Sequence, residues 1–218
     1  MATAMSTFVL LLGGKLTVTD RVLAKLAGAR IIAADGGMRH AASLGVVPEL
    51  WVGDFDSSSE DLQAAWPKVA KQQFPASKDM TDGELAVDAA RQRGASRLIL
   101  MGALGGDRSD HAMAHLFLAV AWAERGLPVM LTSGDEEAWP LIAGAFDLDL
   151  PKGSLFSVLG LTHLTGLSLR NARYPLQDVD VPFGSSLTLS NIADGPVAFS
   201  LKKGQAIILS RPFDLTGQ

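Results

Sequence analysis

Two aspartates separated by one residue, Asp54 and Asp56, form the sharpest candidate site in the sequence. On extended backbone, side chains at positions i and i+2 point to the same side, roughly 7 Å apart along the chain. Two carboxylates held in that way repel each other unless a cation lies between them. Mg²⁺ suits the arrangement, because it binds through one or two carboxylates together with substrate phosphates. In the alternative interpretation, Asp54 shapes a turn and Asp56 precedes a helix opened by Ser57, which with Glu60 has the spacing of a capping box.

The segment Lys78-Asp79-Met80-Thr81-Asp82 places a cation and two carboxylates at a predicted helix start. A helix start offers unpaired N–H groups and a partial positive charge, which attract phosphate. Ordinary capping is the alternative, because Thr81 and Glu84 have the spacing of a second capping box. An Asp in the first turn also complements the helix dipole without any ligand.

A glycine-rich turn, Gly105-Gly106-Asp107-Arg108, follows an apolar run and leads into a helix near Asp110 and His111. Glycines let the backbone approach a ligand closely, and Arg binds phosphate through two parallel hydrogen bonds. Alternatively, the glycines serve the turn alone, with Ser109 or Asp110 as the helix cap. Asp35-Gly36-Gly37 has the same ambiguity.

Other chemistries lack their signatures. Gly14-Lys15 is followed by Leu16, which excludes a P-loop, and no GxGxxG follows a predicted strand. The chain has no Cys, which excludes thiolate nucleophiles and disulfides. His40 and His163 are typical of solvent or interface histidines. The tryptophans indicate packing in the interior rather than a stacking platform: Trp51, Trp66, Trp122 and Trp139.

The elements that must position these residues alternate between strand-like and helix-like segments in the first two thirds of the chain. Strands without period-2 alternation, separated by helices, indicate a parallel sheet that is covered on both faces. In such sheets ligands bind outside the carboxyl ends of the strands, where the candidate residues lie. The predicted strands are the apolar runs at 8–12, 31–34, 50–52, 98–101 and 129–131.

After Asp135 the helical periodicity disappears, and short apolar or alternating runs are separated by Gly, Pro, Asn and Asp. This pattern predicts a small antiparallel β-sandwich. The fold class is therefore α/β: a parallel-sheet α/β nucleotide-binding catalytic domain at 1–138, followed by a β-sandwich domain at 139–218.

Composition narrows the class of protein. Hydrophobic residues make up 48% of the 218 residues and charged residues 19%, which is globular rather than disordered. A net charge of −4 argues against a sequence-independent nucleic-acid partner, which would need a basic surface. No apolar run approaches the roughly 20 residues of a membrane span. Phe8–Leu12 lacks a preceding basic flank, so we expect a buried strand rather than a signal peptide, and a cytoplasmic protein.

The acidic pairs, the helix-start Lys and the Gly-Gly turn with its Arg all follow strands of one α/β domain. Together they indicate a site for a metal–polyphosphate complex, in which positioning and charge neutralisation supply most of the catalysis.

At these residues the sequence closely resembles the thiamine pyrophosphokinase family over nearly its whole length. The resemblance implies an α/β catalytic domain and a β-sandwich that helps to bind thiamine. Its landmarks occur in order as Asp35-Gly36-Gly37, Gly53-Asp54-Phe55-Asp56-Ser57, Lys78-Asp79-x-Thr81-Asp82, Gly102-Ala103-x-Gly105-Gly106, Arg108-x-Asp110-His111, Tyr174-Pro175-Leu176, Phe183-Gly184-Ser185-Ser186-Leu187 and Ser190-Asn191.

The resemblance implies that ATP and thiamine give AMP and thiamine diphosphate with Mg²⁺, the thiamine hydroxyl attacking the β-phosphorus. Transferred residue by residue, it makes Asp54, Asp56 and Asp82 the metal ligands. It makes Lys78 and Arg108 neutralise the phosphates, while Thr81 touches phosphate or the incoming hydroxyl. The nucleotide is expected against Asp35, Gly36, Gly37, Gly105, Gly106, Arg108 and Asp110. Because a bound metal would make its carboxylate ligands poor bases, we expect no dedicated general base, with Asp79 or Asp110 free to accept the proton.

The resemblance also implies a homodimer with the active site at the subunit interface, where Tyr174, Ser190 and Asn191 hold thiamine and the aromatic ring stacks on the cationic ligand. Two other functions stay open. One is a thiamine or nucleotide sensor without catalysis, although a mere binder gains nothing from repelling carboxylates. The other is an AMP-forming diphosphotransferase that acts on another alcohol.

Overall fold

The computed structural model describes residues 6–75 and 79–215, which form two compact units. The first unit runs to Leu118 and includes Leu127–Gly134. The second unit contains Ala119–Gly126 and the chain from Asp135 onward. The predicted domain boundary between residues 138 and 139 stays a prediction.

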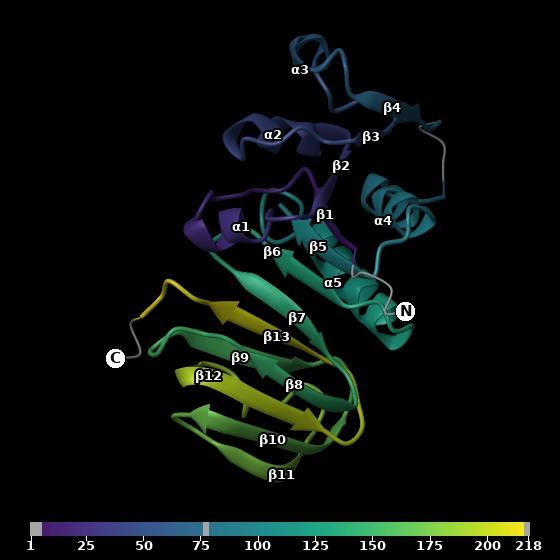
Figure 1. Ribbon diagram of the computed structural model, residues 1–218. Helices are drawn as coiled ribbons and strands as arrows, with labels where there is room; N and C mark the ends of the chain where they lie inside the picture. The colour runs from purple at the N-terminus through teal and green to yellow at the C-terminus, as the bar shows by residue number, and fades with distance from the viewer. Residues whose placement is uncertain (1–5, 76–78, 216–218) are drawn as a thin grey trace, which may run out of the picture. The chain divides into compact units, whose positions relative to one another are not determined.

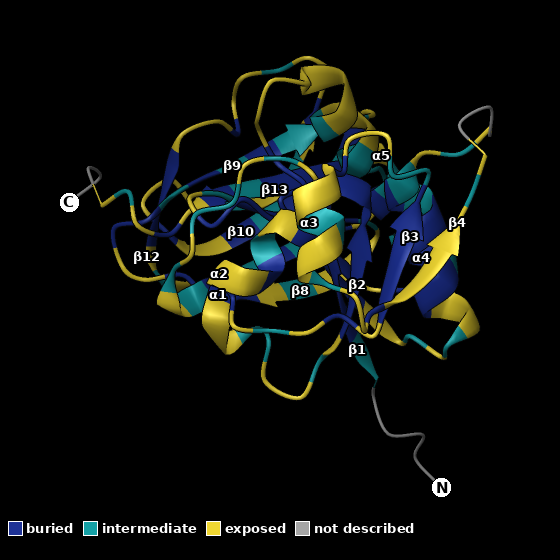
Figure 2. Cartoon of the chain, turned by 90° about the horizontal axis from the view of Figure 1, so that it is seen from above, coloured by how far each residue is buried: buried dark blue, intermediate teal, exposed yellow. Residues whose placement is uncertain are grey.

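The first unit is built on a parallel sheet, as the uninterrupted apolar runs predict. Every neighbouring pair in the sheet is parallel. The strand interiors are buried on both faces, except at the edge strand β4, where every residue is exposed (Figure 2). The strand order is β4 (Ala70–Gln73), β3 (Leu50–Gly53), β2 (Arg30–Ala34), β1 (Thr7–Leu11), β5 (Arg97–Met101) and β6 (Val129–Thr132).

Helices cover this sheet on both sides. Figure 1 shows α4 on one side of the strands and α1 and α2 on the other, and α4 contacts β1, β2 and β3. The capping box predicted at the start of α4 is confirmed, with both of its reciprocal hydrogen bonds present between Thr81 and Glu84. The helices are α1 (Asp20–Ala24), the 3-10 helix η1 (Asp35–Arg39), α2 (His40–Ser43), α3 (Glu60–Ala65), α4 (Asp82–Gln92) and α5 (Ser109–Glu124).

The other predicted capping box, Ser57 with Glu60, is wrong. Helix α3 begins one residue after Ser59, whose hydroxyl accepts the hydrogen bond from the backbone N–H of Leu62. The hydroxyl of Ser57 instead donates to the carboxylate of Asp35, at the end of β2. Ser57 thus makes a long-range contact with Asp35 instead of the helix cap that the local spacing predicts.

The strand order reverses at β1, because the chain passes from β1 to β2, β3 and β4 and then returns to β5 on the other side. Such a switch point leaves a crevice at the carboxyl ends of the strands. Glycine allows the connecting loops to pack there. A Cβ atom on Gly37 would lie 2.1 Å from the carbonyl oxygen of Leu11, and one on Gly14 would lie 2.4 Å from that of Gly102.

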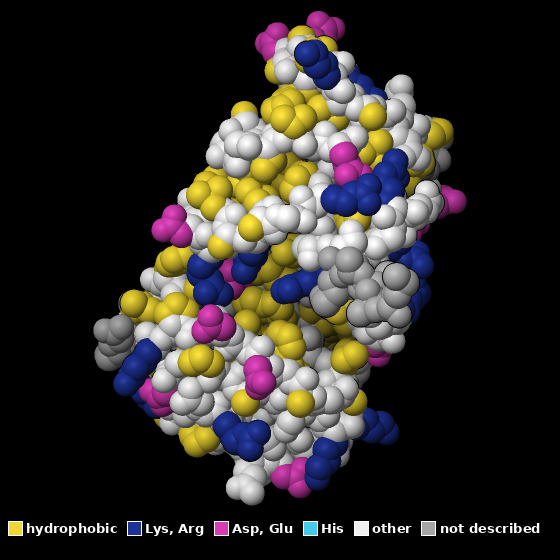
Figure 3. All heavy atoms as spheres, in the orientation of Figure 1, with side chains coloured by type: hydrophobic (Ala, Val, Ile, Leu, Met, Phe, Trp, Pro, Cys, Tyr) yellow, Lys and Arg dark blue, Asp and Glu magenta, His cyan; other side chains and the backbone are white. Residues whose placement is uncertain are grey.

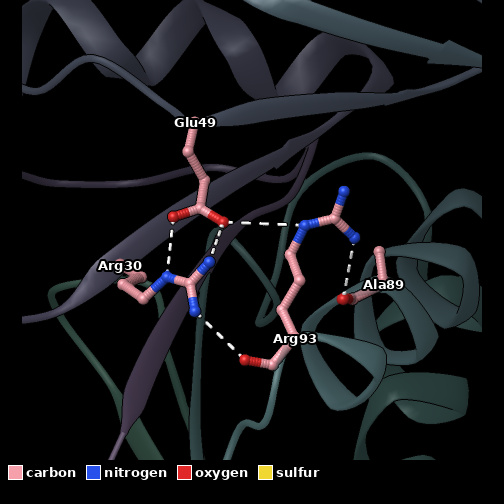
Figure 4. Close-up of polar contacts among 4 residues, drawn as sticks. All are labelled: Arg30, Glu49, Ala89 and Arg93. Carbon is pink, nitrogen blue, oxygen red and sulfur yellow. Dashed lines mark hydrogen bonds and ion pairs between the residues drawn. The ribbon is translucent and has the colours of Figure 1, made fainter.

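At the amino ends of the strands, a network of charged side chains links neighbouring elements (Figure 4). Arg30 at the start of β2 donates two hydrogen bonds, of 2.8 and 2.6 Å, to the carboxylate of Glu49, which precedes β3. A third bond of 3.1 Å joins Arg30 to the carbonyl of Arg93, the C-cap of α4. Arg93 itself donates to the carbonyl of Ala89 at 3.1 Å. The network links β2, β3 and α4 at the amino ends of the strands, away from the candidate site.

The second unit is antiparallel throughout its described strand pairs, which confirms the predicted fold class. Strand β12 belongs to both of its sheets: Asn191 and Ile192 pair with β9, whereas residues 197–201 pair with β8. The aromatic rings of Phe156 and Phe199 meet edge to face at 5.7 Å in its core. The strands are β7 (Glu137–Leu141), β8 (Gly144–Leu148), β9 (Leu155–Gly160), β10 (Leu164–Ala172), β11 (Leu176–Val181), β12 (Asn191–Leu201) and β13 (Ala206–Arg211).

The surface agrees with the mixed charge of the sequence. On the face drawn in Figure 3, Lys and Arg side chains are interspersed with Asp and Glu. Within the part of the chain that the structure describes, no helix has both the length and the apolar character needed to cross a membrane.

Candidate active site

Asp35 is a buried acidic residue at the carboxyl edge of the parallel sheet, held by several hydrogen bonds. It follows β2, is only 7% exposed, and has a φ of 38°. Its carboxylate accepts hydrogen bonds from both Ser57 and Ser58, the latter at 2.8 Å. Its backbone carbonyl accepts a bond of 2.8 Å from the indole N–H of Trp51. Donors to both carboxylate oxygens and to the carbonyl fix the direction of this side chain.

Asp54 and Asp56 follow β3, but they are not presented by an extended strand as predicted. Phe55 between them has a φ of 67°, in the left-handed region. The backbone N–H of Asp56 donates to a carboxylate oxygen of Asp54 at 3.2 Å, which closes a tight turn. The ring of Phe55 lies edge-on to that of Trp51, 5.1 Å between centroids. The two carboxylates are therefore arranged by a turn anchored to a buried aromatic ring.

Three carboxylates converge where these loops meet the start of α4. Asp35, Asp54 and Asp82 each place an oxygen atom within 4.8 Å of the other two. Asp35, which the sequence assigned to the nucleotide, thus joins two of the three predicted metal ligands. Neighbouring negative charge, that of Asp54 above all, raises the pKa of Asp56, and the charges of Asp35 and Asp82 add to it.

This donor set fits a hard divalent cation. Carboxylate oxygens are the ligands that Mg²⁺ takes from proteins, and a cation would relieve the repulsion that the raised pKa of Asp56 reveals. We refer to Asp35, Asp54 and Asp82 as the acidic cluster.

The segment at the start of α4 contains residues that cap the helix and residues of the candidate site. The hydroxyl of Thr81 accepts from the backbone N–H of Glu84 at 3.2 Å, and Glu84 accepts from the N–H and hydroxyl of Thr81 at 2.8 and 3.0 Å. Asp82 is the first residue of the helix and belongs to the acidic cluster. The predicted phosphate ligand Lys78 lies outside the described residues.

The glycine-rich turn after β5 presents an ion pair to solvent. Gly105 and Gly106 have φ values of 69° and 97°, conformations that favour glycine. Arg108 donates two hydrogen bonds, of 3.0 and 2.8 Å, to the carboxylate of Asp110. The guanidinium holds the pKa of Asp110 well below its usual range. While it is paired with Arg108, Asp110 is a weak base, and its role in accepting a proton stays a prediction.

Two histidines that are not among the predicted site residues, His40 and His115, contact the same loops. The Nε2 atom of His40 lies 2.9 Å from the carbonyl oxygen of Gly14, and Nδ1 of His115 lies 3.0 Å from that of Ala103. Burial lowers the pKa of both imidazoles. His40 is thus not the ordinary solvent or interface histidine predicted, and no local pattern signals its contact with a loop 26 residues away.

A cavity of about 80 Å³ lies beside His115, lined by Thr81, Glu84, His111, Ala114, His115 and Leu118.

In the second unit, the structure brings together the predicted ligand residues Tyr174, Ser190 and Asn191. The side chain of Tyr174 is exposed, at 61%, whereas Asn191 is buried, at 4%. The Asn191 carboxamide accepts from the backbone N–H of Tyr174 at 3.1 Å and donates to its carbonyl at 2.8 Å. Ser190 has a φ of 56°, and its N–H donates to the hydroxyl of Ser157 at 3.0 Å. Asn191 therefore supports Tyr174 through the backbone.

Comparisons with known proteins match both units to one family. The model of the thiamin pyrophosphokinase catalytic domain matches residues 24–131, and that of the thiamin pyrophosphokinase vitamin B1 binding domain matches residues 146–205. A thiamine pyrophosphokinase of Bacillus subtilis is 26% identical over 183 residues, which cover 82% of this chain and 85% of that protein.

Solved structures show the same fold. The crystal structure of the Bacillus subtilis thiamine pyrophosphokinase superimposes with a TM-score of 0.84 at 24% identity, covering 95% of this chain and 100% of that one. A thiamin pyrophosphokinase family protein from Enterococcus faecalis gives 0.78 at 27% identity, covering 95% and 99%. The similarity therefore extends over both units of the chain.

Proposed function

The chain belongs to the thiamin pyrophosphokinase family, and we propose that it transfers the terminal diphosphoryl group of ATP to the hydroxyl of thiamine, giving thiamine diphosphate and AMP. The observation that carries this proposal is the acidic cluster at the carboxyl edge of the parallel sheet. The thiamine hydroxyl oxygen bonds to the β-phosphorus while the bond from the β-phosphorus to the oxygen of AMP breaks. Such a transfer depends on positioning and on neutralising charge, for which a cation held by carboxylates is suited.

Asp35, Asp54 and Asp82 would hold Mg²⁺, with Asp56 beside them. When bound, the ion supplies positive charge to the phosphates of ATP. The serine hydroxyls on Asp35 keep that carboxylate aimed at the cluster. Asp56, whose pKa is raised by its neighbours, would be a further ligand of the ion, as the resemblance implies.

The nucleotide would lie across the loops that follow β2 and β5. Gly36 and Gly37 in the first, and Gly105 and Gly106 in the second, let the backbone approach the phosphates. Arg108 would exchange the carboxylate of Asp110 for phosphate, which is an accessible step because both partners are exposed. Lys78 and Thr81 complete the proposed phosphate contacts.

Thiamine would be held by the second unit. The exposed ring of Tyr174 offers a flat face to a cationic heterocycle. Ser190 would contribute a hydroxyl, while Asn191 keeps the backbone of Tyr174 in place.

We further propose a homodimer with the active site at its interface. Support comes from the connection between β11 and β12, where Phe183, Leu187 and Leu189 are exposed at 72%, 58% and 42%, near in sequence to the proposed thiamine ligands. Several large apolar side chains exposed in one short connection favour a surface that a partner covers. Sedimentation equilibrium of the native protein and of a Phe183→Ser/Leu187→Ser variant tests the dimer.

³¹P NMR of the purified protein with ATP, Mg²⁺ and thiamine tests the reaction. We expect AMP and thiamine diphosphate to appear together, and only when thiamine is present. ADP with thiamine monophosphate would preserve the site but overturn the transfer chemistry. Intact ATP in a sample that still binds thiamine would favour a sensor, and turnover with another alcohol in place of thiamine would favour a related diphosphotransferase.

A further inference from the structure

The indole of Trp51 contacts both of the loops that carry the acidic cluster. Trp51 lies in β3 and is fully buried, with 0% of its surface exposed. Its N–H donates to the backbone carbonyl of Asp35, 2.8 Å away on the loop after β2. Its ring packs against that of Phe55, on the loop after β3, at 5.1 Å and an interplanar angle of 80°. The Trp51 side chain thus joins Asp35, which bears one carboxylate of the acidic cluster, to Phe55, which is next to Asp54.

Both loops need such a restraint, because each contains a left-handed residue other than glycine. Asp35 has a φ of 38° and Phe55 a φ of 67°. Residues with a Cβ atom are held in this region only when their surroundings fix it, and such positions gather at functional sites. For Asp35 the surroundings are the hydroxyls on its carboxylate and the indole on its carbonyl. For Phe55 they include the indole ring.

The edge strand holds this aromatic pair in place from outside. The ammonium of Lys71 in β4 lies 5.0 Å from the ring of Trp51 and 5.5 Å from that of Phe55. It also donates to the side-chain carbonyl of Gln63 in α3 at 3.1 Å. A cation at this distance from the ring faces is attracted by their negative charge. Lys71 therefore connects the edge strand to both rings of the Trp51–Phe55 pair.

We propose that Trp51 is a positioning residue that sets the spacing of the Asp35 and Asp54 carboxylates and so the affinity of the acidic cluster for its cation. The inference rests on the proposed function, in which the cluster holds Mg²⁺. Trp51 has no role in contacting substrate. Groups that orient metal ligands from behind typically change metal affinity by about 10- to 100-fold when they are removed.

The test is a pair of tryptophan substitutions. Trp51→Phe keeps a ring against Phe55 but removes the indole N–H that holds Asp35. Trp139→Phe, at a buried tryptophan in β7 of the second unit, is the matched control for the loss of an indole from the interior. Mn²⁺ binding to nucleotide-free protein is measured by electron paramagnetic resonance, and the Mg²⁺ dependence of turnover is measured alongside thermal unfolding.

We expect Trp51→Phe to weaken Mn²⁺ binding by about tenfold or more and to raise the Mg²⁺ concentration for half-maximal turnover equally, while Trp139→Phe changes neither. A merely structural role would lower the fraction of folded protein without changing the Mn²⁺ affinity of the molecules that are folded. Unchanged affinity in folded Trp51→Phe would therefore overturn the inference.

Phe55→Leu is a second test of the inference if Trp51→Phe does not fold. It keeps an apolar side chain on the left-handed residue but removes the ring that meets the indole, so Mn²⁺ binding should again weaken. Native affinity in this folded variant would count against the inference. If the native protein binds no Mn²⁺, both the metal site and the inference are overturned. If the native protein and the variants bind Mn²⁺ with the same affinity, only the inference is overturned.

Discussion

The carboxamide of Asn191 holds the backbone of Tyr174 at both of its polar groups. Its oxygen accepts from the N–H of Tyr174 at 3.1 Å, and its nitrogen donates to the carbonyl at 2.8 Å. The same oxygen also accepts from the N–H of Ile192 at 2.8 Å. A buried side chain therefore fixes the place from which the exposed ring of Tyr174 reaches solvent.

Asn191→Ala should impair thiamine binding and stability together. The change leaves the part-buried backbone groups of Tyr174 without their partner, which costs about 1–3 kcal/mol in the free energy of unfolding. We expect a higher KM for thiamine and an unchanged KM for ATP, measured by steady-state kinetics and urea unfolding. Asn171→Gly is the control, since it removes a carboxamide bonded to Pro196 and suits a φ of 60°. An unchanged KM for thiamine in folded Asn191→Ala would remove the positioning role.

The ring of Tyr174 rather than its hydroxyl should matter for thiamine. Tyr174→Phe keeps the aromatic face and should keep the KM for thiamine, whereas Tyr174→Leu should raise it roughly 2- to 30-fold, the range of a cation–π interaction. Both variants should unfold like the native protein, because the side chain is exposed. If Tyr174→Phe were as impaired as Tyr174→Leu, the hydroxyl would be the important group.

Asp54→Asn should lower the pKa of Asp56. The charge of Asp54 is the largest cause of the raised pKa, so removing it should return the Asp56 carboxyl toward its ordinary value. Carboxyl ¹³C NMR titration of metal-free protein measures the change. Asp82→Asn serves as the comparison, because the charge of Asp82 is the smallest of the named causes and should matter less. Equal shifts in the two variants would contradict the observed arrangement.

Both variants should also lose Mg²⁺-dependent turnover, by at least about tenfold at a fixed subsaturating Mg²⁺ concentration. Chelation of Mg²⁺ should abolish the activity of the native protein, and added Mg²⁺ should restore it. Normal Mg²⁺-dependent turnover in Asp82→Asn would exclude Asp82 from the mechanism.

Acid should destabilise the first unit through its two half-buried histidines. Burial lowers the pKa of His40 and His115 in the folded protein, so the unfolded chain takes up their protons first as the pH falls. Their contribution to the free energy of unfolding is therefore complete above about pH 6.5, the ordinary pKa of His, and is lost progressively below it.

Urea unfolding at several pH values between 7.5 and 5 measures this loss. A His40→Gln/His115→Asn variant should show a shallower fall in the free energy of unfolding than the native protein. His163→Gln, at an exposed histidine of the second unit, should retain the native slope. A double variant with the native slope would mean that other groups cause the acid sensitivity.

Local patterns in the sequence predict the elements of this fold better than the contacts between them. The parallel sheet follows from uninterrupted apolar runs, and the capping box of Thr81 and Glu84 forms as its spacing predicts. The equally good spacing of Ser57 and Glu60 fails, because Asp35 offers Ser57 a partner 22 residues away. Such competition is decided only when two strands bring their loops together.

The candidate site shows the same division. Residue types and spacing predict a cation site at Asp54 and Asp56, whereas Asp82 enters the predicted metal ligands only through the family resemblance. The turn at Phe55 and the indole bond from Trp51 to Asp35 could not be predicted, because Trp51 looks like any interior aromatic residue in sequence. The resemblance to a family names the residues of a site but not which of them support the others.

Asp110→Asn should distinguish a direct role of Asp110 in nucleotide binding from a role in holding Arg108. In the structure the Asp110 carboxylate accepts two hydrogen bonds from the Arg108 guanidinium. The phosphates of ATP must therefore displace the Asp110 carboxylate in order to bind Arg108. Removing the charge of Asp110 should then lower the KM for ATP modestly, whereas Arg108→Gln should raise it, as steady-state kinetics at low and high salt would show. Salt should reduce both effects, because the two side chains are exposed and their interaction is screened. A higher KM for ATP in Asp110→Asn would instead place its carboxylate on the nucleotide, as the sequence motif predicts, and would make the ion pair with Arg108 a part of the bound state.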